Sequence, residues 1–169
     1  MVKVNPKEVY KSNVDPKEVY KRLVRRQDVP CNWDAYPDIR KGLYRYVGTL
    51  ASTDQTIPPR LMDSAISFGI IEAGPGPQSK MHDHDVEEIF IPLDGLWEVA
   101  WGKSEEEVEK VTLGPLDLIS VPPGILRCFS NVGSNIARLM VIQTSATPDS
   151  GAHLFADQSS LENLKQHNR

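Results

Sequence analysis

The chain has 169 residues, of which 40% are hydrophobic and 25% charged, a composition that predicts one folded domain and excludes wholesale disorder. It has no run of 18 apolar residues and begins with a charged segment, so we expect neither a membrane span nor a secretory signal. Two cysteines exclude a disulfide-built scaffold and favour a cytoplasmic protein, and the net charge of −4 disfavours nucleic-acid binding.

Residues 1–30 are predicted to form a basic arm. They hold eight Lys or Arg against four Asp or Glu, whereas the rest of the chain carries a net charge of −8. A short repeat, Val4–Lys11 and Val14–Lys21, places Asn or Asp before Pro in both copies, which is the pattern of a helix N-cap followed by proline at the first helical position. We expect two short helical turns that pack on the domain or on a second subunit. An arm that binds an anionic partner is the alternative.

Residues 31–150 are predicted to form a β domain. Short β-branched or aromatic runs alternate with Gly, Pro, Asp and Asn, without a long helix between them, which indicates an antiparallel sandwich or barrel. Residues 151–169 are expected to form a tail with a short helix at the capping box Ser159–Glu162. The predicted strands are Leu43–Leu50, Ala65–Glu72, Lys80–His84, Glu88–Pro92, Leu96–Trp101, Lys110–Leu113, Leu118–Val121, Leu126–Ser130 and Ala137–Gln143.

One segment combines residue types that bind metals. His82 and His84 point to the same face if they lie on a strand, and Glu88 shares their parity provided that no bulge intervenes. Two imidazoles and one carboxylate on one face can bind Fe(II) or a similar metal and leave coordination positions open. Glu87 has the opposite parity and is the weaker candidate. Two surface histidines in an acidic loop are the alternative interpretation.

The same segment resembles the first motif of the cupin superfamily, G-x5-H-x-H-x3-E-x6-G. Its fixed positions are matched by Gly76, His82, His84, Glu88 and Gly95. The resemblance covers roughly residues 40–145, the core of the predicted domain. It implies an all-β fold, a small antiparallel jelly-roll barrel, in which the motif histidines and glutamate turn inward. It also implies a divalent metal ion, Fe, Mn, Ni or Zn, held by these three side chains.

The second cupin motif is kept only in part. Pro122–Gly124 matches its turn, Asn131 matches its closing asparagine, and Asp117 fits its acidic position, although Leu116 stands where a glycine is expected. Arg127 stands where the family has the histidine that usually supplies the last metal ligand. A guanidinium stays protonated and has no lone pair to donate to a metal.

Two arrangements follow from this replacement. In the preferred one, His82, His84 and Glu88 hold a metal, and Arg127 binds an anionic substrate by forked hydrogen bonds. Arg127 and Glu88 are then the candidate catalytic residues. In the other, no metal binds and Arg127 pairs with Glu88, an attraction on the order of 4 kcal/mol at an effective dielectric constant near 20, before desolvation is counted.

Other residues are weaker candidates. Cys128 has the parity opposite to Arg127 and is expected to pack outside the barrel lumen. Gln143 and Phe90 are candidates for lining the pocket. Trp97 and Trp101 are expected in the core, and His153 and His167 at the surface. Arg60 is expected in a loop able to cover a mouth of the barrel.

By family analogy, these features imply a metal-dependent oxidoreductase of dioxygenase type that acts on a small organic acid or phenolic compound. One alternative is a metal-free isomerase or epimerase, with a barrel histidine as general base and Arg127 as the anion-binding group. Another is a non-catalytic ligand-binding or sensor barrel. The expected partners are an anionic small molecule and a second copy of the chain in a homodimer, with no nucleic acid and no membrane.

Overall fold

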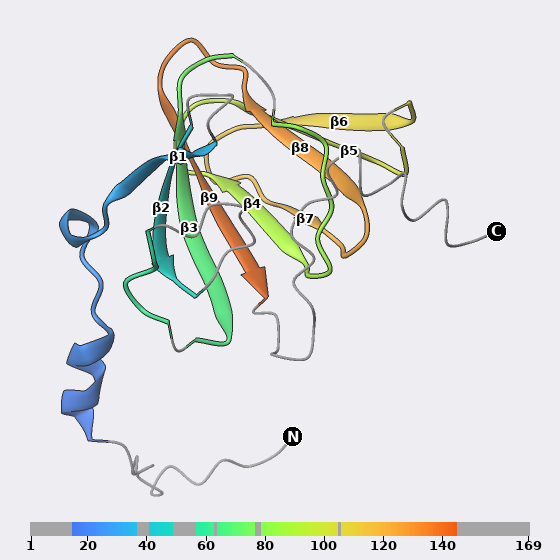
Figure 1. Cartoon of the computed structure of the whole chain (residues 1–169). Helices are drawn as coiled ribbons and strands as arrows, with labels where there is room; N and C mark the ends of the chain where they lie inside the picture. The colour runs from blue at the N-terminus through green and yellow to red at the C-terminus, as the bar shows by residue number, and fades with distance from the viewer. Residues whose placement is uncertain are drawn as a thin grey trace, which may run out of the picture.

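Two antiparallel sheets face each other across the interior of the molecule (Figure 1). The computed structural model describes residues 15–36, 41–48, 57–62, 64–76, 79–104 and 106–144. The larger sheet has the strand order β1-β2-β3-β9-β4-β7 and the smaller one β6-β5-β8, so the predicted all-β antiparallel jelly roll is confirmed. The strands are β1 (Cys31–Tyr36), β2 (Lys41–Val47), β3 (Ile66–Ala73), β4 (Glu88–Pro92), β5 (Trp97–Gly102), β6 (Val108–Leu113), β7 (Ile119–Val121), β8 (Leu126–Asn131) and β9 (Ala137–Thr144).

Alternating burial explains why most strands were predictable. Along β3 and β9 every second residue is buried, because inward and outward side chains alternate on a strand that packs on one face. β4 has the predicted bounds, and most other predicted strands shift by a few residues at their ends. β1 was not predicted. Its pairing with β2 shifts register between Asn32 and Tyr36, so its sequence lacks a regular alternation.

The predicted strand Lys80–His84 is wrong. Within this segment the structure has a single β-bridge, between His82 and Arg127 of β8. Backbone hydrogen bonds join Ser79 to Phe129 and His82 to Arg127. The three-residue interval from Ser79 to His82 is therefore paired with the two-residue interval from Phe129 to Arg127 on β8. The extra residue is a bulge, which interrupts the regular ladder.

The interior is filled by aromatic and aliphatic side chains from both sheets. Phe129 of β8 lies 5.5 Å from Phe90 of β4 and 6.3 Å from Trp97 of β5, measured between ring centroids. Asn131, also on β8, donates hydrogen bonds to the carbonyl oxygens of Ala73 (2.9 Å) and Asn135 (2.7 Å). The bond to Ala73 joins the smaller sheet to the larger one. Asn131, the closing asparagine of the second motif, thus has a structural role in holding the two sheets together.

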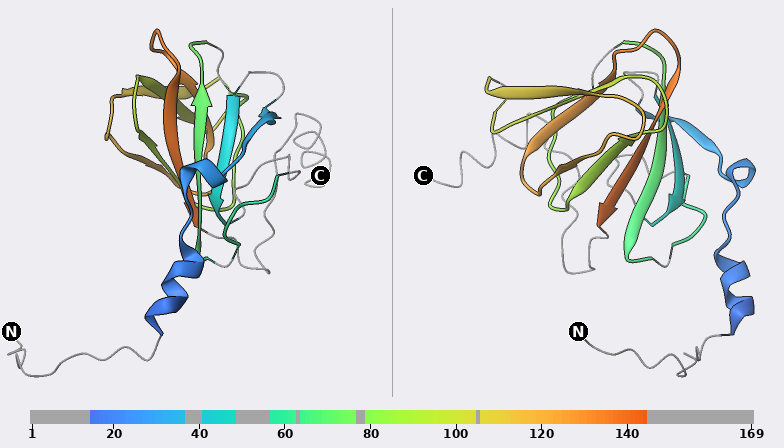
Figure 2. Two further views of the ribbon diagram at one scale, coloured as in Figure 1. Left: turned by 90° about the vertical axis from the view of Figure 1, so that its left-hand side faces the viewer. Right: turned by 180° about the vertical axis from the view of Figure 1, so that it is seen from behind.

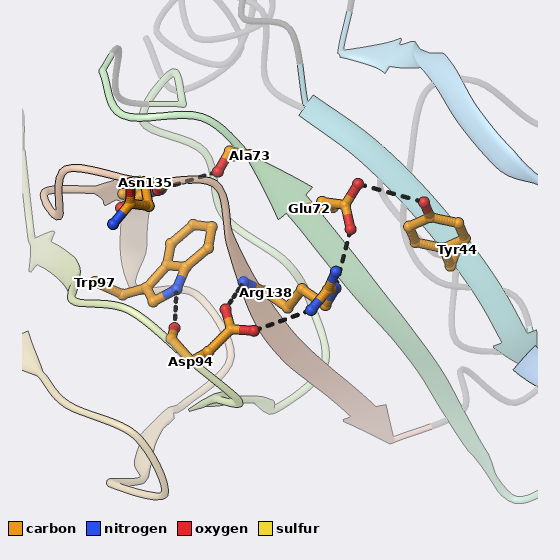
Figure 3. Close-up of polar contacts among 8 residues, drawn as sticks. Tyr44, Glu72, Ala73, Asp94, Trp97, Asn135 and Arg138 are labelled. Atoms are coloured by element: carbon orange, nitrogen blue, oxygen red, sulfur yellow. Dashed lines mark hydrogen bonds and ion pairs between the residues drawn. The ribbon is translucent and has the colours of Figure 1, made fainter.

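A polar network covers the outer side of the larger sheet (Figure 3). Arg138 of β9 lies 2.9 Å from Glu72 of β3 and 3.1 Å from Asp94 in the turn between β4 and β5. Tyr44 of β2 donates a longer hydrogen bond, 3.5 Å, to Glu72. The side chains of Arg138 and Asp94 are 50% and 43% exposed, so their ion pair contributes modestly to stability and mainly fixes the turn against β9.

The arm reaches away from the barrel (Figures 1 and 2). The second copy of the repeat forms the 3-10 helix η1 (Pro16–Arg22), capped by Asp15, whose carboxylate accepts a hydrogen bond from the Lys17 N–H at 2.9 Å. None of its residues is buried. A second short turn, η2 (Arg26–Asp28), meets the barrel where the Arg26 guanidinium lies 3.8 Å from the ring centroid of Tyr44.

Several predictions fall on other parts of the chain. The first repeat copy, the capping box Ser159–Glu162, His153 and His167 lie outside the described residues. Among the described helices, none is long and apolar enough to cross a membrane.

Candidate metal centre

His82, His84 and Glu88 converge in the barrel interior. The two histidines lie on the segment that runs beside β8, and Glu88 is the first residue of β4 in the other sheet. All three are buried, with 8%, 3% and 4% of their surfaces exposed. Their ligand atoms lie within 4.8 Å of one another, and the two imidazole centroids are 4.9 Å apart.

The structure brings His82, His84 and Glu88 together as predicted, but these residues do not lie on one strand. Strand parity was expected to align Glu88 with the histidines, but a bend at residues 85–86 carries the chain from one sheet to the other. Glu87, the weaker candidate, is exposed and contacts the hydroxyl of Ser120. The pattern H-x-H-x3-E thus marks a crossing between sheets rather than one continuous strand.

A backbone carbonyl fixes the tautomer of His82. Nδ1 of His82 lies 2.8 Å from the carbonyl oxygen of Lys80. Because a carbonyl oxygen can only accept, Nδ1 must carry the proton. Nε2 of His82 then keeps its lone pair, which is the form that a metal-binding histidine needs.

The two oxygens of Glu88 have different surroundings. Oε1 accepts a hydrogen bond of 2.8 Å from the side-chain amide of Gln143 on β9. Oε2 lies 3.5 Å from Nε2 of His84 and 3.1 Å from Nε of Arg127. Oε2 therefore faces both the histidine and the guanidinium, and Arg127 forms a close ion pair with it. A buried carboxylate oxygen thus lies between His84 and Arg127.

Arg127 is completely buried beside the trio. Its guanidinium donates hydrogen bonds to the carbonyl oxygens of Ile125 (2.9 Å) and Val86 (3.4 Å), in addition to its contact with Glu88. These contacts engage three of the five N–H groups that a guanidinium offers.

Burial controls the protonation of the trio. It lowers the pKa of His82 to about 4 and that of His84 to about 3, and the positive charge of Arg127 acts in the same direction on both. It raises the pKa of Glu88 to about 7, against the opposing effects of Arg127 and Gln143. The imidazoles are therefore neutral at neutral pH, as metal coordination requires.

Comparisons with known proteins agree on the fold. No family model and no curated protein matches the chain. Among solved structures, it is similar to the capsular polysaccharide assembling protein CapF from Staphylococcus aureus, with 13% identity and a TM-score of 0.57 over 76% of this chain and 33% of that one. It is similar to the Lactobacillus farciminis oxalate decarboxylase, with 17% identity and a TM-score of 0.52 over 70% of this chain and 32% of that one.

The Drosophila melanogaster CENP-C cupin domain is also similar, with 14% identity and a TM-score of 0.53 over 73% of this chain and 81% of that one. The chain has the cupin fold. It spans about a third of the length of CapF and of the oxalate decarboxylase. At these identities the similarity fixes the architecture of the cupin barrel and leaves its chemistry to its own residues.

Lys41 is a charged residue of the cupin interior that sequence reasoning missed. It lies on β2, is 1% exposed, and its ammonium donates a hydrogen bond of 2.9 Å to the Phe129 carbonyl oxygen. The ammonium also lies 4.3 Å from the Phe129 ring centroid. Burial lowers the pKa of Lys41 to about 7, against the raising effect of Cys128. No signal in the sequence indicated it, because the predicted strand began at Leu43 and left Lys41 outside.

The weaker candidates divide between the site and the core. Gln143 is in the site, through its bond to Glu88. Cys128 is buried on the face of β8 opposite to Arg127, outside the trio. Phe90 and Trp97 are fully buried in the core cluster, while Trp101 is partly buried against it. Arg60 is exposed.

The donor set of the cupin barrel fits a divalent metal. His82, His84 and Glu88, with ligand atoms within 4.8 Å of one another, form the two-His-one-carboxylate set. Gln143 and the Lys80 carbonyl supply the outer contacts that orient such ligands. The nearby charge of Arg127 opposes a cation and is partly offset by its pairing with Glu88.

Proposed function

We propose that this cupin barrel is a metal-dependent oxidoreductase of dioxygenase type that acts on a small organic acid or phenolic compound. The observation that carries the proposal is the convergence of His82, His84 and Glu88, whose ligand atoms lie within 4.8 Å in a buried site. With Fe(II) bound, such a three-ligand set leaves positions open for a substrate and O2. Mn, Ni and Zn fit the same donors.

The surrounding residues have separate roles in this proposal. Gln143 holds Oε1 of Glu88, which leaves Oε2 directed at the histidines. The Lys80 carbonyl keeps the proton of His82 on Nδ1. Arg127 binds an anionic oxygen of the substrate through the N–H groups that Ile125 and Val86 leave open. Burial excludes bulk water, which strengthens these electrostatic contacts.

Metal analysis of protein purified without a nickel column tests the proposal. We expect a stoichiometric amount of divalent metal in the wild type and loss of that metal in His82→Ala, because the variant removes one of the three donors that the described residues bring together. His153→Ala, a histidine distant in the sequence, is the matched control and should keep the metal. Oxygen consumption with a panel of phenols and small carboxylic acids then identifies the reaction.

Trace metal that His82→Ala leaves unchanged would contradict the proposal. It would favour a metal-free isomerase or a ligand-binding barrel, for which one observation speaks directly. Arg127 and Gln143 already surround Glu88 at 3.1 Å and 2.8 Å, so the carboxylate has charge and hydrogen-bond partners without a metal. The solved structure of CENP-C bound to CAL1 is an example of a similar fold in complex with another protein.

A further inference from the structure

Six large apolar side chains lie together on the outer face of the larger sheet. They occupy outward positions, because the residues that alternate with them on β3, β4 and β9 are buried. All six are partly exposed, and they lie outside the core cluster. The strand register sets them in two rows, which we call the outer array: Phe68, Ile142 and Ile89 in one row, and Ile70, Met140 and Ile91 in the other.

The outer array differs from a sheet face made for water. An antiparallel sheet with one solvated face carries polar side chains there, in alternation with the apolar ones that face the core. Polar outward residues follow at one end of the outer array, where Glu72 pairs with Arg138 (Figure 3). On β2 the ring of Tyr46 lies 5.0 Å from that of Phe68, so the apolar surface continues onto a fourth strand. A contiguous apolar surface of this kind marks an interaction site.

The arm carries apolar side chains that its own barrel leaves uncovered. None of the residues of η1 is buried, and Val19, Tyr20 and Leu23 are 65%, 78% and 56% exposed. The arm meets the barrel next to the outer array, because Arg26 stacks on Tyr44, whose cross-strand partner on β3 belongs to the array. From there η1 stands apart from the barrel (Figures 1 and 2), in a position to contact another molecule.

The charges of the arm and of the array border are complementary. Residues 15–30 hold five Lys or Arg against three Asp or Glu. At the polar end of the outer array, the carboxylates of Glu72 and Asp94 flank the guanidinium of Arg138. Opposite charges around an apolar contact favour the encounter and fix its orientation. Each copy of the chain thus offers both an arm and a surface that suits the arm, so two copies can form a closed pair with two identical contacts.

We propose that two copies of the chain form a dimer by exchanging arms, with η1 of each copy lying on the outer array of the other. The apolar residues of η1 cover the array, and its lysines approach Glu72 and Asp94. The metal-binding trio lies in the barrel interior, on the opposite side of this sheet. The inference therefore goes beyond the proposed function and adds an interaction surface that does not depend on it.

Light scattering coupled to size exclusion of the full-length protein tests this inference. We expect the wild type to have twice the mass of the chain. Val19→Asp/Leu23→Asp in the arm and Met140→Glu in the array should each halve that mass, because each places a carboxylate in an apolar contact. The arm variant changes no buried residue, so it leaves the barrel folded. Val108→Asp is the matched control: Val108 is 41% exposed on β6 of the smaller sheet, and this variant should stay dimeric.

A monomeric wild type would overturn the inference. So would an arm variant that remains dimeric, because the contact would then not involve η1, and so would a dimer that Met140→Glu leaves intact. Loss of the dimer in Val108→Asp would place the interface on the smaller sheet instead. The metal content of His82→Ala tests the proposed function separately, so the two ideas can fail independently.

Discussion

Leu116 occupies a backbone conformation that suits glycine. Its φ is +70°, in the left-handed region, where a Cβ crowds the following carbonyl. The turn is held by Asp117, whose carboxylate accepts a hydrogen bond of 2.8 Å from the Gly114 N–H. The side chain of Leu116 is 79% exposed, so it offsets little of this strain by burial. The positive φ thus explains why the cupin motif has a glycine where this chain has Leu116.

Leu116→Gly should therefore stabilise the protein. The substitution removes the cost of the left-handed conformation, about 1–2 kcal/mol. Against this, glycine loses more conformational entropy on folding, which costs about 0.5–1 kcal/mol. The free energy of unfolding should therefore rise by about 1 kcal/mol. Urea denaturation measures it. Leu118→Gly is the control, since Leu118 is also exposed but has no positive φ, and that variant should be less stable than the wild type. A loss of stability in Leu116→Gly would show that the turn is not strained.

At the scale of elements, the segment that carries the two histidines depends on a few contacts with β8. Ser79 makes three of them: its hydroxyl accepts a hydrogen bond of 2.9 Å from the Phe129 N–H and lies 3.3 Å from the Phe129 carbonyl, and its own N–H donates to that carbonyl at 3.0 Å. Toward the site, a pair of backbone bonds joins His82 to Arg127, and the carbonyl oxygen of His84 accepts a further one from the Gly124 N–H. Ser79 therefore helps to position His82 and His84.

Ser79→Ala should loosen this segment. The buried N–H of Phe129 loses its acceptor, which costs about 1–3 kcal/mol of unfolding free energy. Hydrogen exchange should show lower protection of the Phe129 and His82 amides. Ser120→Ala removes an exposed hydroxyl that contacts Glu87, and it should change stability by less than about 0.5 kcal/mol. Equal exchange protection in wild type and Ser79→Ala would contradict this role.

The sequence predicts which residues form the site better than it predicts how the chain brings them together, and the elements show why. H-x-H-x3-E and alternating burial depend on local spacing, which a sequence displays directly. The bulge between Ser79 and His82 depends on pairing with β8, almost 50 residues further along the chain, and has no local signal. The same holds for Gln143, whose contact with Glu88 joins residues 55 positions apart.

At the scale of the whole molecule, Lys41 and Asn131 both join the two sheets. Asn131 does so through a neutral hydrogen bond from β8 to Ala73 of β3. Lys41 does so with an ammonium, from β2 to the Phe129 carbonyl of β8. A buried ammonium costs free energy unless it is well paired, and here a carbonyl and an aromatic ring take the place of a carboxylate. The interior was predicted from apolar patterning, which gives no reason to place a lysine inside.

This buried lysine makes stability depend on pH in a defined direction. Its pKa is lowered to about 7 in the folded protein from an ordinary value of 10.5, with Cys128 and His82 as its electrostatic neighbours. Between these two values the unfolded chain binds more protons than the folded one, so the free energy of unfolding rises with pH. Relative to Lys41→Met, the wild type should gain up to about 1.4 kcal/mol per pH unit above pH 7. Urea denaturation of both proteins from pH 7 to 9.5 measures the difference, and Lys110→Met, which removes an exposed lysine paired with Glu98, is the control. Parallel stability curves for wild type and Lys41→Met would mean that Lys41 keeps its proton inside the barrel.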